Sequence, residues 1–136
     1  MTALSAGKKR VLFVDDEEDL VTALSARLQA GGYEVLVARD GLEALQKARS
    51  LFPDLIILDL MLPKMDGYKV ARLLKFDQRY VKIPIIMLTA RGQDIDQEAG
   101  KKAGADDYIV KPFDSAYLMI RIKELLAKAA ESAKPE

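Results

Sequence analysis

The sequence predicts a three-layer α/β fold in which one parallel sheet lies between two layers of helices. Short runs of strand-forming residues alternate along the chain with segments of helical periodicity, and each type occurs five times. The strand-forming runs are apolar at nearly every position, which is typical of parallel strands covered on both faces. Together, these two observations indicate a doubly wound sheet within a single domain.

The first strand–helix unit begins with the apolar run 11–14, which predicts a strand. Leu20, Leu24 and Leu28 then recur at helical spacing, and we expect Gly31 to end this helix.

The second unit contains the strand-forming run 35–38 and a helix that begins after Asp40. Asp40 is a suitable N-cap because its carboxylate can accept a hydrogen bond from the first helical turn. Pro53 follows the end of this helix, whose apolar positions are Leu42, Leu45 and Ala48.

The remaining three units follow the same order. The runs 55–58, 85–88 and 108–110 predict the last three strands. Apolar residues at helical spacing indicate the helices that follow these strands: Val70, Leu73 and Leu74; Ile95, Ala99 and Ala103; and Leu118, Ile122, Leu125 and Ala129.

The composition excludes several classes of chemistry. The chain has 136 residues, of which 50% are hydrophobic, enough for one domain with a sizeable core. It contains no Cys and no His, which removes thiolate chemistry and His-dependent catalytic triads and leaves oxygen ligands for any metal. Lys+Arg and Asp+Glu balance at 21 each, so no global field favours nucleic acid or a membrane surface. Because no secretory signal or membrane-spanning run is evident, we expect a cytoplasmic protein.

Polar side chains follow four of the five predicted strands. Asp15 and Asp16 follow the first strand, and Asp59 ends the third. Thr89 follows the fourth strand and Lys111 follows the fifth. In open α/β sheets, ligands bind outside the carboxyl ends of the strands, near the point where strand order reverses. We therefore expect these five residues to form one site.

The charges of this site favour a divalent cation. The three carboxylates carry about −3 at neutral pH and Lys111 about +1, so one divalent cation would balance the remainder. Mg²⁺ is usually held by one or two carboxylates, several waters and phosphate oxygens. Phosphate as a partner suggests Asp59 as the oxygen nucleophile, with Lys111 and Thr89 contacting the transferred phosphoryl group. The sequence thus predicts phosphorylation of Asp59 with Mg²⁺ as cofactor.

Each of these residues also has a structural explanation when taken alone. Asp15 and Asp16 could form an acidic helix start, Asp59 could end a strand at a turn, and Thr89 could be an ordinary β-branched residue. Lys111 is harder to explain in this way, because it is a lone lysine at the mouth of the sheet. The coincidence of all five at strand ends favours a functional site.

Four segments resemble the motifs of a known family: VLFVDDE (11–17), DLMLPKMDG (59–67), LTA (88–90) and ADDYIVKPF (105–113). They are similar to those of the CheY-like receiver domains of two-component response regulators, over roughly residues 8–130. The resemblance implies a flavodoxin-like (βα)5 fold with strand order 2-1-3-4-5. It also implies that Asp59 accepts a phosphoryl group from a phosphohistidine of a sensor histidine kinase or phosphotransfer protein.

The resemblance also assigns roles to individual residues. Lys111 would contact the phosphoryl group, and the peptide bond before Pro112 would be cis. The ligands of Mg²⁺ would be Asp16, Asp59, the backbone carbonyl of Met61, and Asp15 through water.

A conformational switch is part of the same expectation. Phosphorylation adds negative charge and acceptor oxygens, so Thr89 has reason to move toward the site, and Tyr108 would turn into the vacated space. The segment 93–104 has few apolar anchors and forms, with the last strand and helix, the expected output face for a protein effector. Such a domain is not a conventional enzyme, although it catalyses its own phosphorylation and dephosphorylation.

Met61 and Arg91 are similar to a residue pair in regulators of the OmpR/PhoB type. Because Met offers an attacking water no strong hydrogen bond, we hypothesise slow hydrolysis of the phosphoaspartate. Chains of that type continue into a DNA-binding domain, whereas this sequence ends at Glu136, so we expect no direct nucleic-acid binding by this chain. Tyr117 and Met119 stand where charged residues of that group often pair in dimers, which argues against the usual phosphorylation-driven dimer. A phosphorylation-linked homodimer is kept as an alternative.

Three alternative functions are disfavoured by the sequence. A Mg²⁺-dependent aspartyl phosphatase of the haloacid dehalogenase class would carry Asp-x-Asp after the first strand, which is absent here. A pseudo-receiver, an interaction module without phosphorylation, commonly lacks one of the acidic or lysine positions, all of which are present. A flavin-binding protein is disfavoured by the few aromatic residues. We expect a flexible N-terminus at 1–8, a receiver domain at 9–130, and a tail or linker start at 131–136.

Overall fold

The computed structural model describes residues 7–90 and 104–132 of the chain. Five parallel strands form one sheet in the order β2-β1-β3-β4-β5. The order reverses at β1 and β3, which lie side by side at the centre. The predicted fold class and strand order are therefore confirmed. The strands are β1 (Arg10–Val14), β2 (Glu34–Ala38), β3 (Leu55–Asp59), β4 (Ile85–Ala90) and β5 (Asp107–Lys111).

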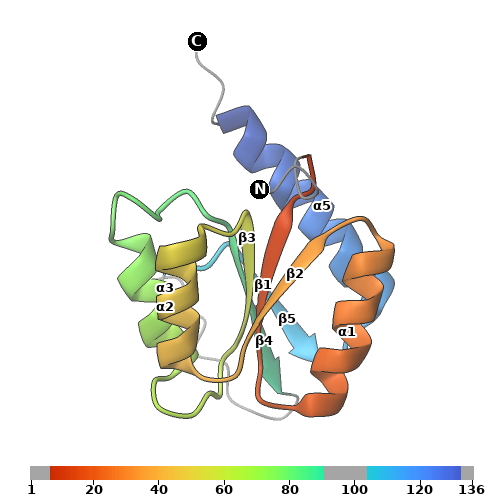
Figure 1. The fold of residues 1–136 in the computed structure, drawn as a ribbon, viewed down its shortest axis with the longest axis horizontal. Coiled ribbons are helices and arrows are strands. Elements are labelled where there is room, and N and C mark those ends of the chain that lie inside the picture. Colours follow the sequence, from red (N-terminus) through yellow and green to blue (C-terminus); the bar gives the residue numbers. More distant parts are fainter. Residues whose placement is uncertain (1–6, 91–103, 133–136) are drawn as a thin grey trace.

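Helices cover both faces of this sheet. Figure 1 shows α1 and α5 on one face and α2 and α3 on the other. The helix predicted around Ile95, Ala99 and Ala103 falls outside the described residues. The helices within them are α1 (Glu18–Ala30), α2 (Gly41–Leu51), α3 (Gly67–Lys75) and α5 (Ser115–Ser132).

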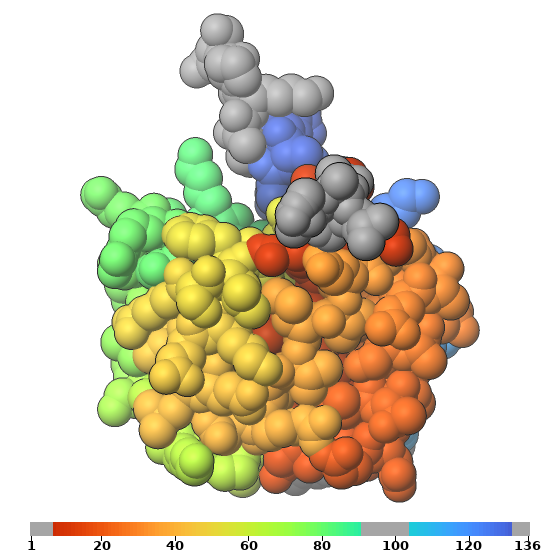
Figure 2. All heavy atoms as spheres, viewed as in Figure 1, coloured from red at the N-terminus to blue at the C-terminus, as the bar shows by residue number. Residues whose placement is uncertain are grey.

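Alternating side chains of each strand enter two separate cores. In β1, Leu12 and Val14 join the cluster beneath α2 and α3, whereas Val11 and Phe13 join the cluster beneath α1 and α5. All five residues of the central strand β3 are buried. In Figure 2 the atoms of α2, in yellow, lie on one side of the molecule and those of α1, in orange, on the other. This burial explains why the strands are apolar at successive positions.

Local hydrogen bonds fix the starts of two helices near the carboxyl edge of the sheet. The Asp40 side chain accepts a 2.8 Å hydrogen bond from the Glu43 N–H at the start of α2, so the predicted N-cap is confirmed. Asp66 accepts one of 2.9 Å from the Lys69 N–H at the start of α3. A Cβ at Gly67 would lie 2.6 Å from the carbonyl oxygen of Asp59, so α3 begins in direct contact with the end of β3.

Two leucines that the sequence placed on apolar helix faces are instead exposed. Leu42 of α2 is 49% exposed and Leu73 of α3 is 38% exposed. The buried stripe of α2 consists of Gly41, Ala44, Leu45 and Ala48. Successive residues of a helix are about 100° apart, so Leu42 lies beside this stripe rather than within it.

No helix of the described ranges is both long enough and apolar enough to cross a bilayer.

Candidate functional site

The carboxyl ends of four strands bring the predicted site residues to one edge of the sheet. Asp15 follows β1, Asp59 is the last residue of β3, and Lys111 is the last residue of β5. Thr89 is the penultimate residue of β4, because this strand runs two residues beyond its predicted end. This edge is at the bottom of the view in Figure 1, where the arrowheads of β4 and β5 point.

Three carboxylates converge at this edge. Each of Asp15, Asp16 and Asp59 offers an oxygen atom, and the three atoms lie within 4.8 Å of one another. Asp15 is fully buried and Asp59 is 8% exposed, whereas Asp16 is open to solvent. The cluster is therefore accessible from one side, through Asp16.

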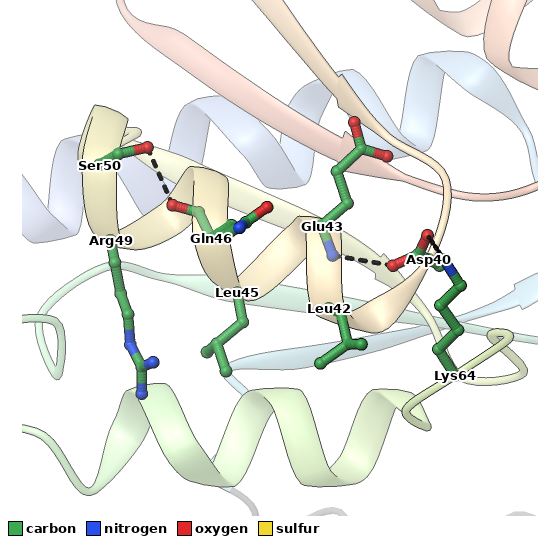
Figure 3. Close-up of a pocket in the computed structure, with 8 residues that line it drawn as sticks. All are labelled: Asp40, Leu42, Glu43, Leu45, Gln46, Arg49, Ser50 and Lys64. Carbon is green, nitrogen blue, oxygen red and sulfur yellow. Dashed lines mark hydrogen bonds and ion pairs between the residues drawn. The ribbon is translucent and has the colours of Figure 1, made fainter.

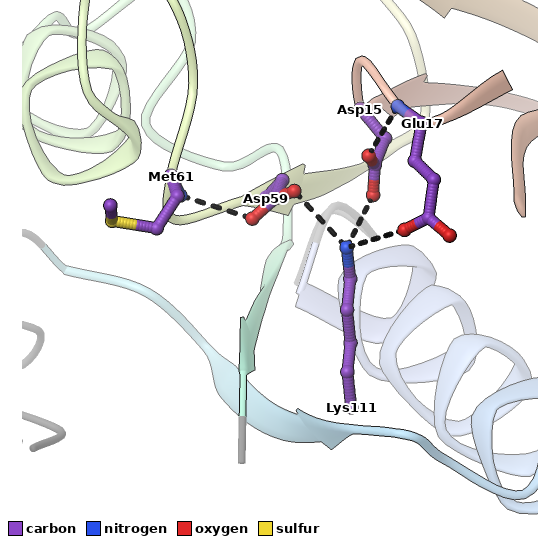
Figure 4. A network of polar contacts seen from close by, with 5 residues as sticks. All are labelled: Asp15, Glu17, Asp59, Met61 and Lys111. Carbon is purple, nitrogen blue, oxygen red and sulfur yellow. Dashed lines mark hydrogen bonds and ion pairs between the residues drawn. The ribbon is translucent and has the colours of Figure 1, made fainter. Parts of the chain in front are cut away.

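Lys111 connects two of these carboxylates. Its Nζ donates hydrogen bonds of 2.8 Å to Asp15 Oδ2 and 3.1 Å to Asp59 Oδ2. Figure 4 shows the lysine stem rising from β5 and its ammonium group pointing between the two acids. The side chain of Lys111 is 19% exposed, so its stem is covered while its charge remains within the site.

Backbone N–H groups hold the other oxygen of each buried carboxylate. The Glu17 N–H donates a 2.9 Å hydrogen bond to Asp15 Oδ1, and the Met61 N–H donates one of 3.0 Å to Asp59 Oδ1. Both contacts join residues two positions apart, a local pattern common for Asp side chains at the ends of strands. Each buried carboxylate is thus oriented from one side by the backbone and from the other by Lys111.

The pKa shifts at the site reflect burial and these contacts. Burial raises the pKa of Asp59 above its ordinary value, and the neighbouring charge of Asp15 adds to the rise, although the hydrogen bonds from Met61 and Lys111 oppose it. Burial also opposes the charge of Lys111. The hydrogen bonds to Asp15 and Asp59 outweigh that effect, and the pKa of Lys111 is raised. The site therefore holds excess negative charge at an energetic cost.

The acidic cluster fits Mg²⁺. Its donors are carboxylate oxygens, the hard ligands that Mg²⁺ prefers. In an octahedral site with ligands at about 2.1 Å, neighbouring oxygens lie about 3 Å apart and opposite oxygens about 4.2 Å apart. The 4.8 Å spread of Asp15, Asp16 and Asp59 is close to this range, and modest side-chain rotations would close the gap.

Thr89 and Tyr108 lie on the two strands beside this cluster. Thr89 is fully buried, and its Oγ1 has no hydrogen-bond partner within the described part of the chain. Tyr108 is partly buried on β5 and packs against the core beneath α2 and α3. The register pairs Thr89 with Val110, so Tyr108 and Thr89 are two positions apart along neighbouring strands.

Two further expectations have different outcomes. The peptide bond between Lys111 and Pro112 is cis, as the resemblance implied. Met61 is 62% exposed at the rim of the site, whereas its proposed companion Arg91 lies outside the described residues.

Sequence reasoning did not assign Glu17 a place in the site. Its carboxylate lies 4.0 Å from the ammonium of Lys111, in addition to the backbone contact with Asp15. The run of acidic residues after the first strand was the available signal, but it also describes an ordinary helix start, and Glu17 is indeed the N-cap residue of α1.

Comparison with known proteins decides the family, because residues 11–123 match the response regulator receiver domain. The chain belongs to this family of receiver domains. This is the receiver domain of the response regulators of two-component systems. The resemblance found in the four sequence motifs is confirmed, and nothing in the described residues favours the phosphatase or flavin-binding alternatives.

Individual relatives of this receiver domain support the same assignment. The chain is 46% identical over 125 residues to the alkaline phosphatase synthesis transcriptional regulatory protein PhoP of Bacillus subtilis, covering 92% of this chain and 51% of that protein. The receiver thus spans about half the length of the curated relatives that it matches.

Solved receiver domains share the fold. A CheY-like receiver domain protein from Methanospirillum hungatei superposes with a TM-score of 0.87 at 30% identity, covering 93% of this chain and all of that one. The receiver domain of sensor histidine kinase PA1611 from Pseudomonas aeruginosa has a TM-score of 0.81 at 32% identity, covering 89% of this chain and 99% of that one.

Proposed function

We propose that this receiver domain accepts a phosphoryl group on Asp59 from a phosphohistidine of a sensor histidine kinase or phosphotransfer protein. The observation that carries the proposal is the position of Lys111, whose ammonium group lies between Asp15 and Asp59 beside a third carboxylate. A structural ion pair would need one acid, whereas three acids and one lysine leave a negative site that suits a cation and a phosphate.

The proposed transfer is an in-line displacement at phosphorus. A carboxylate oxygen of Asp59 forms the new O–P bond while the P–N bond of the phosphohistidine breaks, and the imidazole nitrogen leaves with the bonding electron pair. Asp59 Oδ1 accepts the hydrogen bond of the Met61 N–H, and Oδ2 accepts that of Lys111. These two contacts fix the carboxylate plane before the donor arrives, which reduces the entropic cost of the reaction.

After the transfer, the ammonium group of Lys111 would contact the negatively charged phosphoryl group. The ammonium group can exchange the hydrogen bond to Asp59 for one to an oxygen of the phosphoryl group while it retains Asp15. Asp16, Asp59 and the carbonyl of Met61 would hold Mg²⁺ directly, and Asp15 would hold it through water. When bound, Mg²⁺ would offset the negative charge on the phosphoryl oxygens. The similar receiver domain of PA1611 has a magnesium ion coordinated in its active site cleft, which supports this choice of metal.

The consequence of phosphorylation is a conformational switch. The unpartnered hydroxyl of Thr89 would gain an acceptor in the phosphoryl oxygens, and Tyr108 would respond to its movement. The surface formed by β5 and α5 would then control a protein effector, with or without a homodimer. The same site would hydrolyse the phosphoaspartate by attack of water at phosphorus, returning the carboxylate and inorganic phosphate. We place these events in the cytoplasm, without direct binding of nucleic acid by this segment.

The experiment is a phosphorylation assay on the whole chain. Incubation with Mg²⁺ and a small acyl phosphate donor should add the mass of one phosphoryl group, in an acid-stable, base-labile linkage. Asp59→Asn should abolish the adduct. Asp66→Asn is a matched control, because it makes the same chemical change seven positions away and Asn also serves as an N-cap.

Two outcomes would contradict the proposal. An adduct that persists in Asp59→Asn would place the phosphoryl group elsewhere. No adduct in the wild-type chain, with either the small donor or a phosphorylated kinase, would favour an unphosphorylated pseudo-receiver.

A further inference from the structure

The outer surface between α2 and α3 contains a groove that the proposed phosphorylation chemistry does not use. One hollow, of about 760 Å³, runs along α2 and is lined by Leu42, Leu45 and Arg49. A second, of about 750 Å³, lies at the end of α3 and is lined by Leu73 and Phe76 among others. Arg49 lines both hollows, so they adjoin at this residue, and we treat the two together as one groove. Figure 3 shows Leu42, Leu45 and Arg49 projecting from α2 toward α3.

Three large apolar side chains that line the groove are exposed to solvent. Phe76, directly after α3, is 72% exposed, and Leu42 and Leu73 are 49% and 38% exposed. Leu42 lines the hollow along α2, and Leu73 and Phe76 line the adjoining hollow at the end of α3. Grouped apolar residues of this kind are typical of interaction sites.

The acidic residues around the groove form salt bridges, whereas two of its arginines form none within the described part of the chain. Its three acids are each paired with a cation: Asp40 with Lys64, Glu43 with Lys47, and Asp77 with Arg79. Hydrogen bonds from Arg79 hold the pKa of Asp77 at about 2, so this acid stays ionised and bound to its partner.

Arg49 and Arg72, in contrast, form no ion pair with any residue in the described ranges. The groove therefore presents two guanidinium groups without a salt bridge to the described residues beside exposed leucine and phenylalanine, although the charge of Arg49 also acts on Asp77 and helps to lower the pKa of that carboxyl. Guanidinium is the group best suited to bind carboxylates in two-pronged geometry.

The segment beside the α3 end of the groove, which includes the lining residues Asp77 and Arg79, is already held in place. Tyr80 is 4% exposed, its ring lies 5.0 Å from that of Phe52, and Arg79 lies 5.1 Å above it. Two hydrogen bonds of 2.8 and 3.1 Å join Arg79 to the Asp77 carboxylate. A partner would therefore meet an ordered surface, which lowers the entropic cost of binding.

We propose that this groove binds an acidic amphipathic helix of a partner protein. Leucines on one face of that helix would pack against Leu42, Leu73 and Phe76. Carboxylates beside them would pair with Arg49 and Arg72. Nucleic acid would supply the negative charge but would leave the leucines without apolar contacts, so the apolar lining favours a protein segment. The proposal is independent of phosphorylation, because neither Asp59 nor Lys111 lines the groove.

The test uses the whole chain and a synthetic amphipathic peptide of Leu, Ala and Glu, with leucines at helical spacing. NMR titration should shift amide signals on α2 and α3 first. The double substitution Arg49→Glu and Arg72→Glu should weaken binding by about tenfold or more, because two attractive pairs become repulsive. Phe76→Ser should weaken binding as well, with the fold retained because Phe76 is largely exposed. The matched control reverses two exposed charges on α5, Lys123→Glu and Lys128→Glu, and should leave affinity unchanged.

Several results would overturn the proposal. These are peptide-induced shifts confined to other elements, equal weakening by the α5 control, or no binding at millimolar peptide. A peptide with Lys in place of Glu that binds equally well would remove the role of the arginines. If a single-stranded RNA oligonucleotide binds the groove more tightly than the peptide does, the ligand is a nucleic acid and not a protein helix. If the wild-type chain dimerises with increasing concentration and the double substitution Arg49→Glu and Arg72→Glu abolishes this, the groove binds a second copy of the chain and not a partner helix.

Discussion

Lys111 donates a 2.8 Å hydrogen bond to Asp15, although two strands, β3 and β4, separate their strands in the sheet. The lysine stem thus crosses the carboxyl edge of the sheet and carries a positive charge over the end of β3, where Asp59 lies. This single side chain links the last strand of the fold to the first.

Replacing Lys111 with Met should destabilise the protein and make its stability more dependent on Mg²⁺. Asp15 and Asp59 would lose their shared cation, at a cost of about 1–2 kcal/mol, less than for a fully buried pair because the site opens to solvent. Urea unfolding with and without Mg²⁺ measures this, and Lys123→Met on α5 is the control. Equal metal dependence of the variant and the wild type would contradict the expectation.

Asp59→Asn should stabilise the metal-free protein at neutral pH. The raised pKa of Asp59 means that the folded state binds its proton more tightly than the unfolded state, so ionisation costs stability as pH rises through the window above the ordinary value of 3.8. Asn has no charge and avoids this cost.

The pH dependence makes this prediction specific. The gain from Asp59→Asn should be full above the folded pKa and should disappear as pH falls below 3.8, where both side chains are neutral. Urea unfolding across this pH range, without metal, measures the gain. Asp66→Asn should show no such gain, and a variant less stable than wild type at neutral pH would count against the predicted cost.

Thr89→Ala should separate phosphorylation from its structural consequence. The Thr89 hydroxyl has no partner among the described residues, so its removal should change the free energy of unfolding by less than about 1 kcal/mol and leave the Asp59 adduct intact. The NMR response of the Tyr108 ring to phosphorylation should shrink, and affinity for an effector should fall. Thr89→Ser keeps the hydroxyl and should retain the response; an undiminished response in Thr89→Ala would rule out this role.

Met61→Asn should shorten the lifetime of the phosphoaspartate. An amide at this exposed position could hold the attacking water by one hydrogen bond, and about 1 kcal/mol of transition-state stabilisation corresponds to roughly fivefold faster hydrolysis. Loss of the adduct over time, after removal of the donor, measures the rate. Met61→Leu should behave like the wild type, and a slower Met61→Asn would refute the hypothesis.

Gly67→Ala should destabilise the protein by about 1–3 kcal/mol and slow phosphorylation. Its Cβ would lie 2.6 Å from the carbonyl oxygen of Asp59, so either α3 or the end of β3 must shift. Gly31→Ala is a matched control, since its Cβ would meet the flexible end of Met119 and should cost little. Thermal unfolding and the rate of adduct formation are the measurements; equal effects of the two substitutions would exclude the proposed contact.

Much of this arrangement could be predicted because it follows from the backbone. Once the apolar runs are parallel strands, Asp15, Asp59 and Lys111 must lie at one edge of the sheet, whatever their side chains do. The contact between Lys111 and Asp15 could not be predicted in this way, because a long flexible stem can reach several partners.

The groove between α2 and α3 was also beyond prediction from periodicity. Leu42 and Leu73 occur at helical spacing with buried residues, so the pattern alone places them in the core. Their exposure depends on the rotation of each helix against the sheet. Ala44 and Ala71 are the residues of these helices that are buried in the core with the strands, and this arrangement is a property of the assembled layers.

The division of each strand between two cores has a consequence for how this domain can change. Leu12 and Val14 contact one layer of helices and Val11 and Phe13 the other, so the sheet acts as a partition. Substitutions on the outer surfaces of α2 and α3 can accumulate without disturbing the packing of α1 and α5, and the reverse also holds. A lineage could therefore acquire or lose partners on one side of the molecule while the chemistry at the sheet edge and the surface on the other side are inherited unchanged.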